Sequence, residues 1–248
     1  GELQVRVMVT DPPHNVQELT GDTLVQHTFG EERDSSPILS ADQRRLLYTS
    51  KQGENTQIMD ANVDGNGSAR LLTRGNADFF SPHPSLDGKT LLVSSDVFNP
   101  SEGYDIYLLD AFRGIVLQQL IRNPGDDYYP QWLPDETGFV FSSDQGGNHD
   151  IYLGRLDGTQ QRLTDDPGFD GFGTVSPDGS QIAFYSDRDG DYEIYIMDSN
   201  GSNPRRVTTS RGRDASPAFS PDGEWIAFES ERDGDYDIYV MRPDGSNV

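Results

Sequence analysis

The chain has 248 residues, of which 33% are hydrophobic, and it carries a formal net charge of −23 with an isoelectric point near 4.2. A surface of that sign repels phosphate, which excludes nucleic acid and anionic membrane surfaces as partners and favours cations or basic protein surfaces. Because the chain has no cysteine, disulfides, thiolate metal sites and a cysteine nucleophile are excluded too. No apolar run approaches the roughly 18 residues of a membrane span, so we expect no membrane insertion.

The length and composition favour one all-β domain over residues 1–248, because all-β folds of this size are commonly a single unit. Gly and Pro are plentiful, with 26 and 15 residues, which indicates many short strands joined by tight turns. We therefore expect no helix of consequence.

Two segments near the N-terminus are predicted strands. Residues 3–9 (LQVRVMV), within an N-terminal segment 1–21, form an additional strand or the remnant of a preceding repeat. Residues 23–28 (TLVQHT) are followed by FGEERDSSP, and this combined segment, ending at Pro37, aligns with RVTTSRGRDASP at 206–217. We therefore expect segment 22–34 to supply an outer strand that completes the last repeat. The opening sequence lacks the basic start and apolar centre of a secretory signal, which indicates a mature or a cytosolic chain.

From residue 35 onward the sequence repeats about every 45 residues, in units of approximately 35–78, 79–126, 127–169, 170–213 and 214–248. An Asp in the first turn of each unit recurs with spacings of 45, 48, 43 and 44 residues, and an Ile further on recurs with a similar period. These landmarks are Asp42, Asp87, Asp135, Asp178 and Asp222, and Ile58, Ile106, Ile151, Ile194 and Ile238. Such self-similarity is typical of modular folds whose units bury their faces against one another.

Each complete unit contains four predicted strands, and the fourth unit shows them most clearly. Ser-Pro-Asp-Gly at 176–179 suits a type I turn, because Pro pre-sets φ at its second position. The Asp-Gly pair within 188–191 suits a two-residue hairpin. The strands after these turns are 181–186, 193–198 and 205–208, of which the second is apolar on both faces, as expected between two packed sheets.

Four antiparallel strands in about 45 residues are typical of a β-propeller blade. The elements SPDG, IAF-x-S, RDG-D, [DE]-IY and RRLT resemble the TolB-like, PD40 type of WD40-like propeller repeat, with the closest agreement in the last two units. The resemblance implies a periplasmic or extracellular setting and a protein partner docked over one end of the central channel. A cytoplasmic location stays open, since no signal is present in the sequence.

We expect a propeller of five blades, closed by the N-terminal strand that completes the last blade. Six blades are the alternative, in which residues 5–8 form the third strand of a further blade. The resemblance implies this six-bladed alternative, since TolB-like propellers commonly have six blades.

A ring of carboxylates is predicted around the channel mouth, because an Asp precedes the inner strand of each blade, with Asp78 one place out of step. Aromatic residues gather around the same links between blades. The binding candidates are Asp34, Asp78, Asp127, Asp170 and Asp214, together with Tyr128, Tyr129, Trp132 and Phe172. The alternative is that each Asp accepts hydrogen bonds within its own loop, as Asp commonly does in turns.

The acidic hairpins of the last two units raise the question of calcium, which takes six to eight oxygen ligands. The candidate ligands are Asp187, Asp189, Asp191, Asp233 and Asp235. The EF-hand pattern fails, because Gly190 and Gly234 come one residue too early. We expect no cofactor and interpret the carboxylates as turn caps, with calcium as the alternative.

The sequence favours a non-enzymatic, monomeric scaffold that presents an acidic, aromatic-bearing funnel to a protein partner. Its four histidines have no metal-ligand spacing, and no Gly-x-Ser-x-Gly nucleophile elbow is present. The first alternative is a carbohydrate-binding or carbohydrate-active propeller of the hydrolase or lyase type, for which Asp126 and Asp127 beside Trp132 are the carboxyl pair to consider. The second is a structural module of a larger secreted or cell-surface protein.

Overall fold

The computed structural model describes residues 34–63, 68–101 and 103–248. These residues form nineteen strands and no helix, so no described helix is long and apolar enough to cross a membrane. The strands of the first two blades are β1 (Asp34–Leu39), β2 (Arg45–Gln52), β3 (Asn55–Asn62), β4 (Arg70–Leu71), β5 (Phe79–Pro84), β6 (Thr90–Ser95), β7 (Asp105–Asp110) and β8 (Val116–Gln119). Those of the last three are β9 (Asp127–Trp132), β10 (Gly138–Ser143), β11 (Asp150–Arg155), β12 (Gln160–Arg162), β13 (Asp170–Val175), β14 (Gln181–Ser186), β15 (Glu193–Asp198), β16 (Arg205–Arg206), β17 (Asp214–Phe219), β18 (Ile226–Ser230) and β19 (Asp237–Met241).

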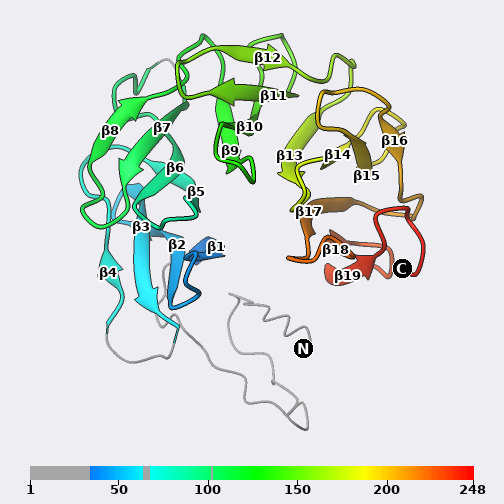
Figure 1. The fold of residues 1–248 in the computed structure, drawn as a ribbon, viewed down its shortest axis with the longest axis horizontal. Coiled ribbons are helices and arrows are strands. Elements are labelled where there is room, and N and C mark those ends of the chain that lie inside the picture. The colour runs from blue at the N-terminus through cyan, green and yellow to red at the C-terminus, as the bar shows by residue number, and fades with distance from the viewer. Residues whose placement is uncertain (1–33, 64–67, 102) are drawn as a thin grey trace, which may run out of the picture.

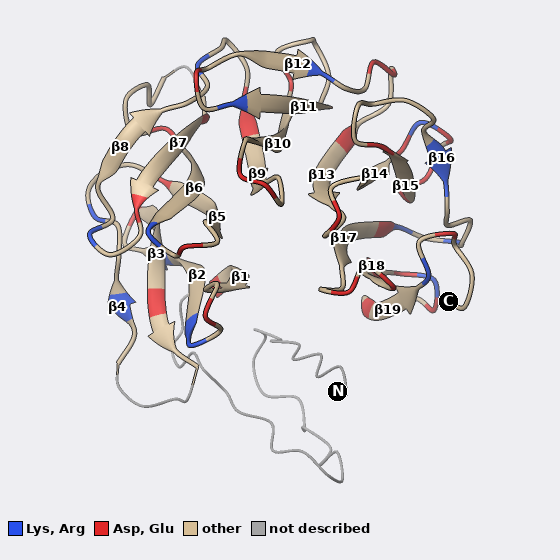
Figure 2. Cartoon of the chain, in the orientation of Figure 1, with Lys and Arg blue, Asp and Glu red and all other residues tan. Residues whose placement is uncertain are grey.

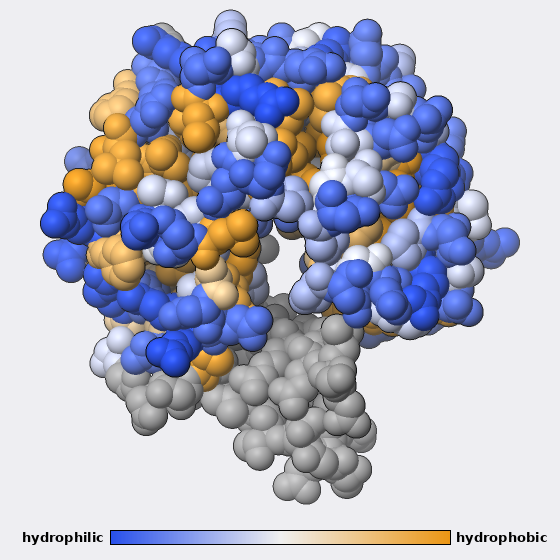
Figure 3. All heavy atoms as spheres, viewed as in Figure 1, coloured by the Kyte–Doolittle hydropathy of each residue, from blue (hydrophilic) through white to orange (hydrophobic). Residues whose placement is uncertain are grey.

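The strands form five antiparallel sheets, each of which is a meander of neighbouring strands. Figure 1 shows the sheets arranged radially, with β1, β5, β9, β13 and β17 toward the centre and β4, β8, β12 and β16 at the periphery. A central opening between the blades is visible in the space-filling view (Figure 3). The predicted all-β propeller of five blades is confirmed.

Consecutive blades pack face to face, as β2 and β3 do on β5 and β14 and β15 do on β17. The described strands of the fifth blade make no contact with those of the first. The two predicted N-terminal strands, including the one expected to close the ring, lie outside the described residues.

The core consists of apolar layers between adjacent blades. The Ile landmark of the third strand is 0% exposed in the first four blades, where it packs between its own sheet and the next. In the fifth blade the equivalent Ile238 is 45% exposed. Burial of this position therefore depends on the presence of a following blade.

The turn between the first and second strands is held by its Asp. In the fourth blade, Asp178 accepts hydrogen bonds from the Ser176 hydroxyl at 2.6 Å and from the Ser180 N–H at 3.0 Å. The next residue, Gly179, has φ of 72°, a left-handed conformation that glycine adopts without steric cost. Gln43 occupies the same place in the first blade at φ of 58°, so the turn forms there with a strained residue.

Every inner strand contains a bulge near its start, where the register to the second strand shifts. The third residue of each inner strand has a positive φ: Ser36, Ser81, Tyr129, Phe172 and Ser216. Because the conformation recurs with Ser, Tyr and Phe alike, the strain belongs to the fold and does not by itself mark a functional residue.

Candidate functional site

The links between blades lie at one end of the propeller, because inner strands and third strands begin there while second strands end there. We call this end the link face. Buried carboxyls meet at the last three junctions on this face: there the inner strand of one blade begins with an acid, and so does the third strand of the blade before it. The pairs are Asp105 with Asp127, Asp150 with Asp170, and Glu193 with Asp214. In each pair the field of one carboxylate contributes to the raised pKa of the other, which is Asp127, Asp150 or Glu193.

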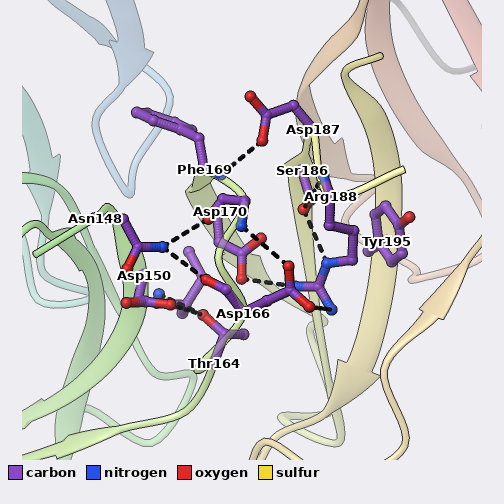
Figure 4. A network of polar contacts seen from close by, with 12 residues as sticks. Asn148, Asp150, Thr164, Asp166, Phe169, Asp170, Ser186, Asp187, Arg188 and Tyr195 are labelled. Atoms are coloured by element: carbon purple, nitrogen blue, oxygen red, sulfur yellow. Dashed lines mark hydrogen bonds and ion pairs between the residues drawn. The ribbon is translucent and has the colours of Figure 1, made fainter. Parts of the chain in front are cut away.

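Arginines neutralise the carboxyls at the junction of the third and fourth blades (Figure 4). The Arg188 guanidinium donates to Asp170 at 2.7 Å, and its carbon lies 4.8 Å from the centre of the Tyr195 ring. Arg162 donates to Asp150 at 2.5 Å. Burial raises the pKa of Asp150 to about 6, although Arg162 opposes the shift. Each of these arginines therefore neutralises a buried carboxyl of its own blade, at the junction with the adjoining blade.

The same arrangement recurs one junction further on. Glu193 accepts from Arg206 and, at 2.6 Å, from the Thr208 hydroxyl. Asp214 accepts from the Ser230 hydroxyl at 2.5 Å and forms an ion pair with Arg232 at 3.3 Å. The repeated RDG-D and RRVT elements thus have a structural role, because each provides partners for a buried carboxyl of its own blade.

The junction of the second and third blades departs from this pattern. Two glutamines replace the arginines of the next junction. Gln119 pairs with the Tyr of the third strand, as Arg162 does in the next blade. Gln145 follows the last Ser of the second strand by two residues, as Arg188 does in the next blade. Gln119 donates to Asp105 at 2.8 Å, whereas Gln145 donates to Gln160 of the outer strand β12 and reaches no buried carboxyl. Burial raises the pKa of Asp127 to about 7, and the fields of neighbouring carboxylates add to the shift.

Aromatic rings follow the link face across these junctions and form what we call the aromatic arc. Neighbouring ring centroids along it are separated by 5.4, 5.3, 6.3, 4.6 and 5.9 Å. Its members, in order, are Phe80, Tyr104, Tyr128, His149, Phe169 and Tyr192, all of them half-buried. At its end the Arg213 guanidinium lies 4.7 Å from the centre of the Tyr192 ring.

Carboxylates flank the aromatic arc and hold its backbone. Asp126 accepts the Tyr104 N–H at 2.9 Å, and Asp187 accepts the Phe169 N–H at 2.7 Å. The Tyr104 hydroxyl donates to Asp78 at 3.3 Å. Burial and the field of Asp78 raise the pKa of Tyr104 to about 12, so its hydroxyl stays protonated at neutral pH. The face therefore combines apolar rings and hydroxyl groups with negative charge.

The predicted ring of carboxylates is placed differently from a channel lining. Asp127, Asp170 and Asp214 are fully buried within the blade junctions, so they are not presented to a partner. Asp34 lies at the start of β1, opposite Ser50. Asp78 is one residue out of step, as predicted, because Phe79 takes the position opposite Ser95.

Three of the four aromatic candidates lie together, and the fourth does not. Tyr128 belongs to the aromatic arc, and the Tyr129 ring contacts it at 5.9 Å and Phe172 at 4.9 Å. Trp132 ends β9 at the opposite end of the blade, where it is buried against Phe139 in the core. Its placement at the channel mouth was wrong, because four residues of extended strand separate it from Tyr128.

The sequence interpretation missed Tyr104, His149 and Tyr192. Each directly precedes the acid that begins a third strand, and Tyr236 holds the same position in the fifth blade. This recurrence of an aromatic residue before [DE]-I-Y was the available signal.

The hairpin carboxylates considered for calcium have protein partners. Asp189 accepts the Tyr195 hydroxyl, and Asp233 accepts the Tyr239 hydroxyl. Within the described ranges, no group of three or more His, Cys, Asp or Glu residues is arranged to hold a metal ion. The contacts thus account for these two Asp residues as turn and strand anchors, while calcium binding stays an untested alternative.

The carboxyl pair considered for catalysis is also engaged in the scaffold. Asp126 accepts the backbone N–H of Tyr104, and Asp127 accepts both contacts of the Asn123 amide, at 3.0 and 2.9 Å. Since Asp127 is 0% exposed, no substrate atom reaches it in this structure.

The radially arranged antiparallel sheets define a β-propeller. Residues 150–248 match the PD40 family model, described as the TolB beta propeller domain. The putative TolB of Agrobacterium tumefaciens superposes with a TM-score of 0.78 at 28% identity, over 88% of this chain and 80% of that one. The TolB of Acinetobacter baumannii gives a TM-score of 0.75 at 26% identity, over 86% of this chain and 53% of that one.

Over residues 150–248 the chain is similar to the PD40 repeats of TolB propellers. Among curated proteins, the Tol-Pal system protein TolB of Wolinella succinogenes is 28% identical over 124 residues, which are 50% of this chain and 28% of that protein. The chain thus spans about a quarter of that relative's length. The tricorn protease, at 18% identity and a TM-score of 0.70 over 89% of this chain and 22% of that one, shares the fold alone.

Proposed function

We propose that this chain is a non-enzymatic binding propeller that presents the link face to a protein partner of a Tol-Pal system. The assignment of the partner to a Tol-Pal system is supported by the named relatives, which are Tol-Pal system proteins. A periplasmic location belongs to the same proposal.

The observation that carries the proposal is the aromatic arc. Tyr is enriched at protein interfaces because it offers a large rigid surface with a polar tip. Six half-buried aromatic side chains in a continuous row across two junctions form such a surface. Figure 2 shows Asp and Glu positions on every blade and fewer Lys and Arg positions, so a partner with basic residues around an apolar centre fits best.

The test is titration calorimetry of the full chain against the purified soluble proteins of a Tol-Pal system. We expect the double variant Tyr104→Ala and Tyr128→Ala to weaken binding by about tenfold to a hundredfold, as loss of interface aromatic residues does. Phe112→Ala is the matched control, because Phe112 is 56% exposed but lies in the turn after β7, at the opposite end of the blade. Equal affinity of the double variant and the control would contradict the proposed surface.

A further inference from the structure

In the described part of the chain, four arginines lie over aromatic rings, and three of them also hold a carboxylate. The Arg188 guanidinium has its carbon 4.8 Å from the centre of the Tyr195 ring and donates to Asp170 at 2.7 Å (Figure 4). The ring takes a face of the guanidinium while the carboxylate takes N–H donors at its edge, so the two contacts do not compete. The other two such sets are Arg232 with Tyr239 and Asp214, and Arg242 with Trp225 and Glu224.

Arg213 is the fourth of these arginines, and it has the rings without the carboxylate. Its guanidinium carbon lies 4.7 Å from the centre of the Tyr192 ring and 5.6 Å from that of Tyr185. Among the residues that the structure describes, no carboxylate forms an ion pair with it, and its Nε is buried without a hydrogen-bond partner. All strands of the fourth blade and β17, which follows Arg213, are described. The guanidinium therefore lies on the link face without an anionic partner.

The position of Arg213 in the repeat shows that the fold does not require an arginine there. The residue that directly precedes the inner strand is Asp78, Asp126 and Phe169 in the second, third and fourth blades. In the third, fourth and fifth blades its backbone carbonyl accepts an N–H of the same blade, whatever the side chain. The two Asp side chains also accept a backbone N–H of the preceding blade. Arg213 thus reverses the charge at this position, in a chain whose net charge is −23.

Arg213 also gives the two ends of the aromatic arc opposite charges. Near the first end, the Tyr104 hydroxyl donates to Asp78 at 3.3 Å and the Tyr104 N–H donates to Asp126 at 2.9 Å. The other end is Tyr192, beside which the Arg213 guanidinium lies. Because charges across an interface fix its register and orientation, a partner on the arc is expected to place opposite charges at its own two ends.

We propose that Arg213 binds a carboxylate of the protein partner, at the Tyr192 end of the aromatic arc. The carboxylate takes the N–H donors at the edge of the guanidinium, as Asp170 does at Arg188. The planar guanidinium matches the geometry of a carboxylate, and the ring beside it fixes its orientation. This inference rests on the proposed function, because it names one group of the same partner. It adds that the partner's contact surface, basic near Asp78 and Asp126, carries an acidic group at the other end.

The test is titration calorimetry of the full chain against the same soluble Tol-Pal proteins. Arg213→Met keeps an apolar stem against the rings, and we expect it to weaken binding at least about tenfold. Arg213→Lys keeps the charge but loses the planar fork, so we expect a loss of about threefold to tenfold. Arg211→Met is the matched control, because it removes the same charge from an exposed residue of the same link. The control should bind within about twofold of the unchanged protein, since long-range attraction changes equally in both variants.

Two further measurements complete the experiment. Thermal melting of the three variants checks that each of them folds. A partner with two glycines added at its C-terminus separates the two sources of a carboxylate. If the extension weakens binding to the level of Arg213→Met, the group is the partner's terminal carboxylate; if binding is unchanged, the group is an Asp or Glu side chain.

The variants distinguish failure of this inference from failure of the proposed function. Equal affinities of Arg213→Met and Arg211→Met, together with weaker binding of the Tyr104→Ala and Tyr128→Ala double variant, would overturn the carboxylate site and leave the proposed function standing. Weaker binding of Arg213→Met with an unchanged double variant would support the carboxylate site and refute the arc as the partner surface. Unchanged binding in all variants would overturn both.

Discussion

Asp127 offers the sharpest test of the junction chemistry, because it is a fully buried carboxyl at the junction where glutamines replace both arginines. Burial, with the fields of Asp105 and Asp144, raises its pKa to about 7 from the ordinary 3.8. The folded state therefore holds a proton that the unfolded state has lost between pH 4 and 7. A group with a raised pKa stabilises the fold fully below its unfolded pKa, and this stabilisation is lost as the pH rises through the folded pKa.

The size of the effect follows from the shift. Three pH units correspond to about 4 kcal/mol at about 1.4 kcal/mol per unit, as an upper limit. Asp127→Asn removes the charge and keeps the shape, but its amide must find an acceptor near Asn123 and Ser143. We expect the free energy of unfolding to rise by about 2 kcal/mol at pH 8 and to change by less than about 1 kcal/mol at pH 4.

Urea unfolding followed by circular dichroism at pH 4 to 8 measures the difference between the two proteins. Asp170→Asn is the control, because Asp170 is equally buried but bonded to Arg188. The control should lose stability at pH 8, by about 2 kcal/mol, since a buried arginine loses its countercharge. If Asp127→Asn destabilises the protein at pH 8 as the control does, or its effect is independent of pH, the account of this junction is wrong.

Four further variants test the turn, the core and the ion pair of Arg188 with Asp170. Gln43→Gly should raise the unfolding free energy by about 0.5 kcal/mol in urea titrations, because glycine relieves the left-handed conformation; a loss would show that the turn is unstrained. Ile151→Ala should cost about 3 kcal/mol and Ile238→Ala less than about 1 kcal/mol, since the first is 0% and the second 45% exposed; equal losses would contradict the difference in burial. Arg188→Leu should lower the unfolding free energy by about 3 kcal/mol and lower the melting temperature, because it leaves the buried Asp170 carboxylate without its cationic partner. An unchanged stability would refute the role of this ion pair.

Local chemistry made much of the fold predictable from the sequence. Turn residues such as Asp178 and Gly179 act within a few residues of themselves, and a repeated pattern of turns and apolar strands defines a blade without knowledge of its neighbours. The repeat pattern also predicted that Asp78 lies one residue away from the position of its counterparts, and the strand pairing confirms this, because Phe79 takes that position opposite Ser95.

The environment of each repeated carboxyl was decided only when the blades came together. Asp127 and Asp170 occupy the same repeat position, yet Asp127 bonds to the Asn123 amide and Asp170 bonds to an arginine, and that arginine comes from 18 residues further along the chain. Likewise, the repeat marks Ile238 as a core residue, whereas its exposure depends on which blade follows it. Sequence periodicity determined what each blade is, because turns and strands form from near neighbours. Tertiary packing determined what each blade presents, because burial and charge depend on residues that are distant in the chain.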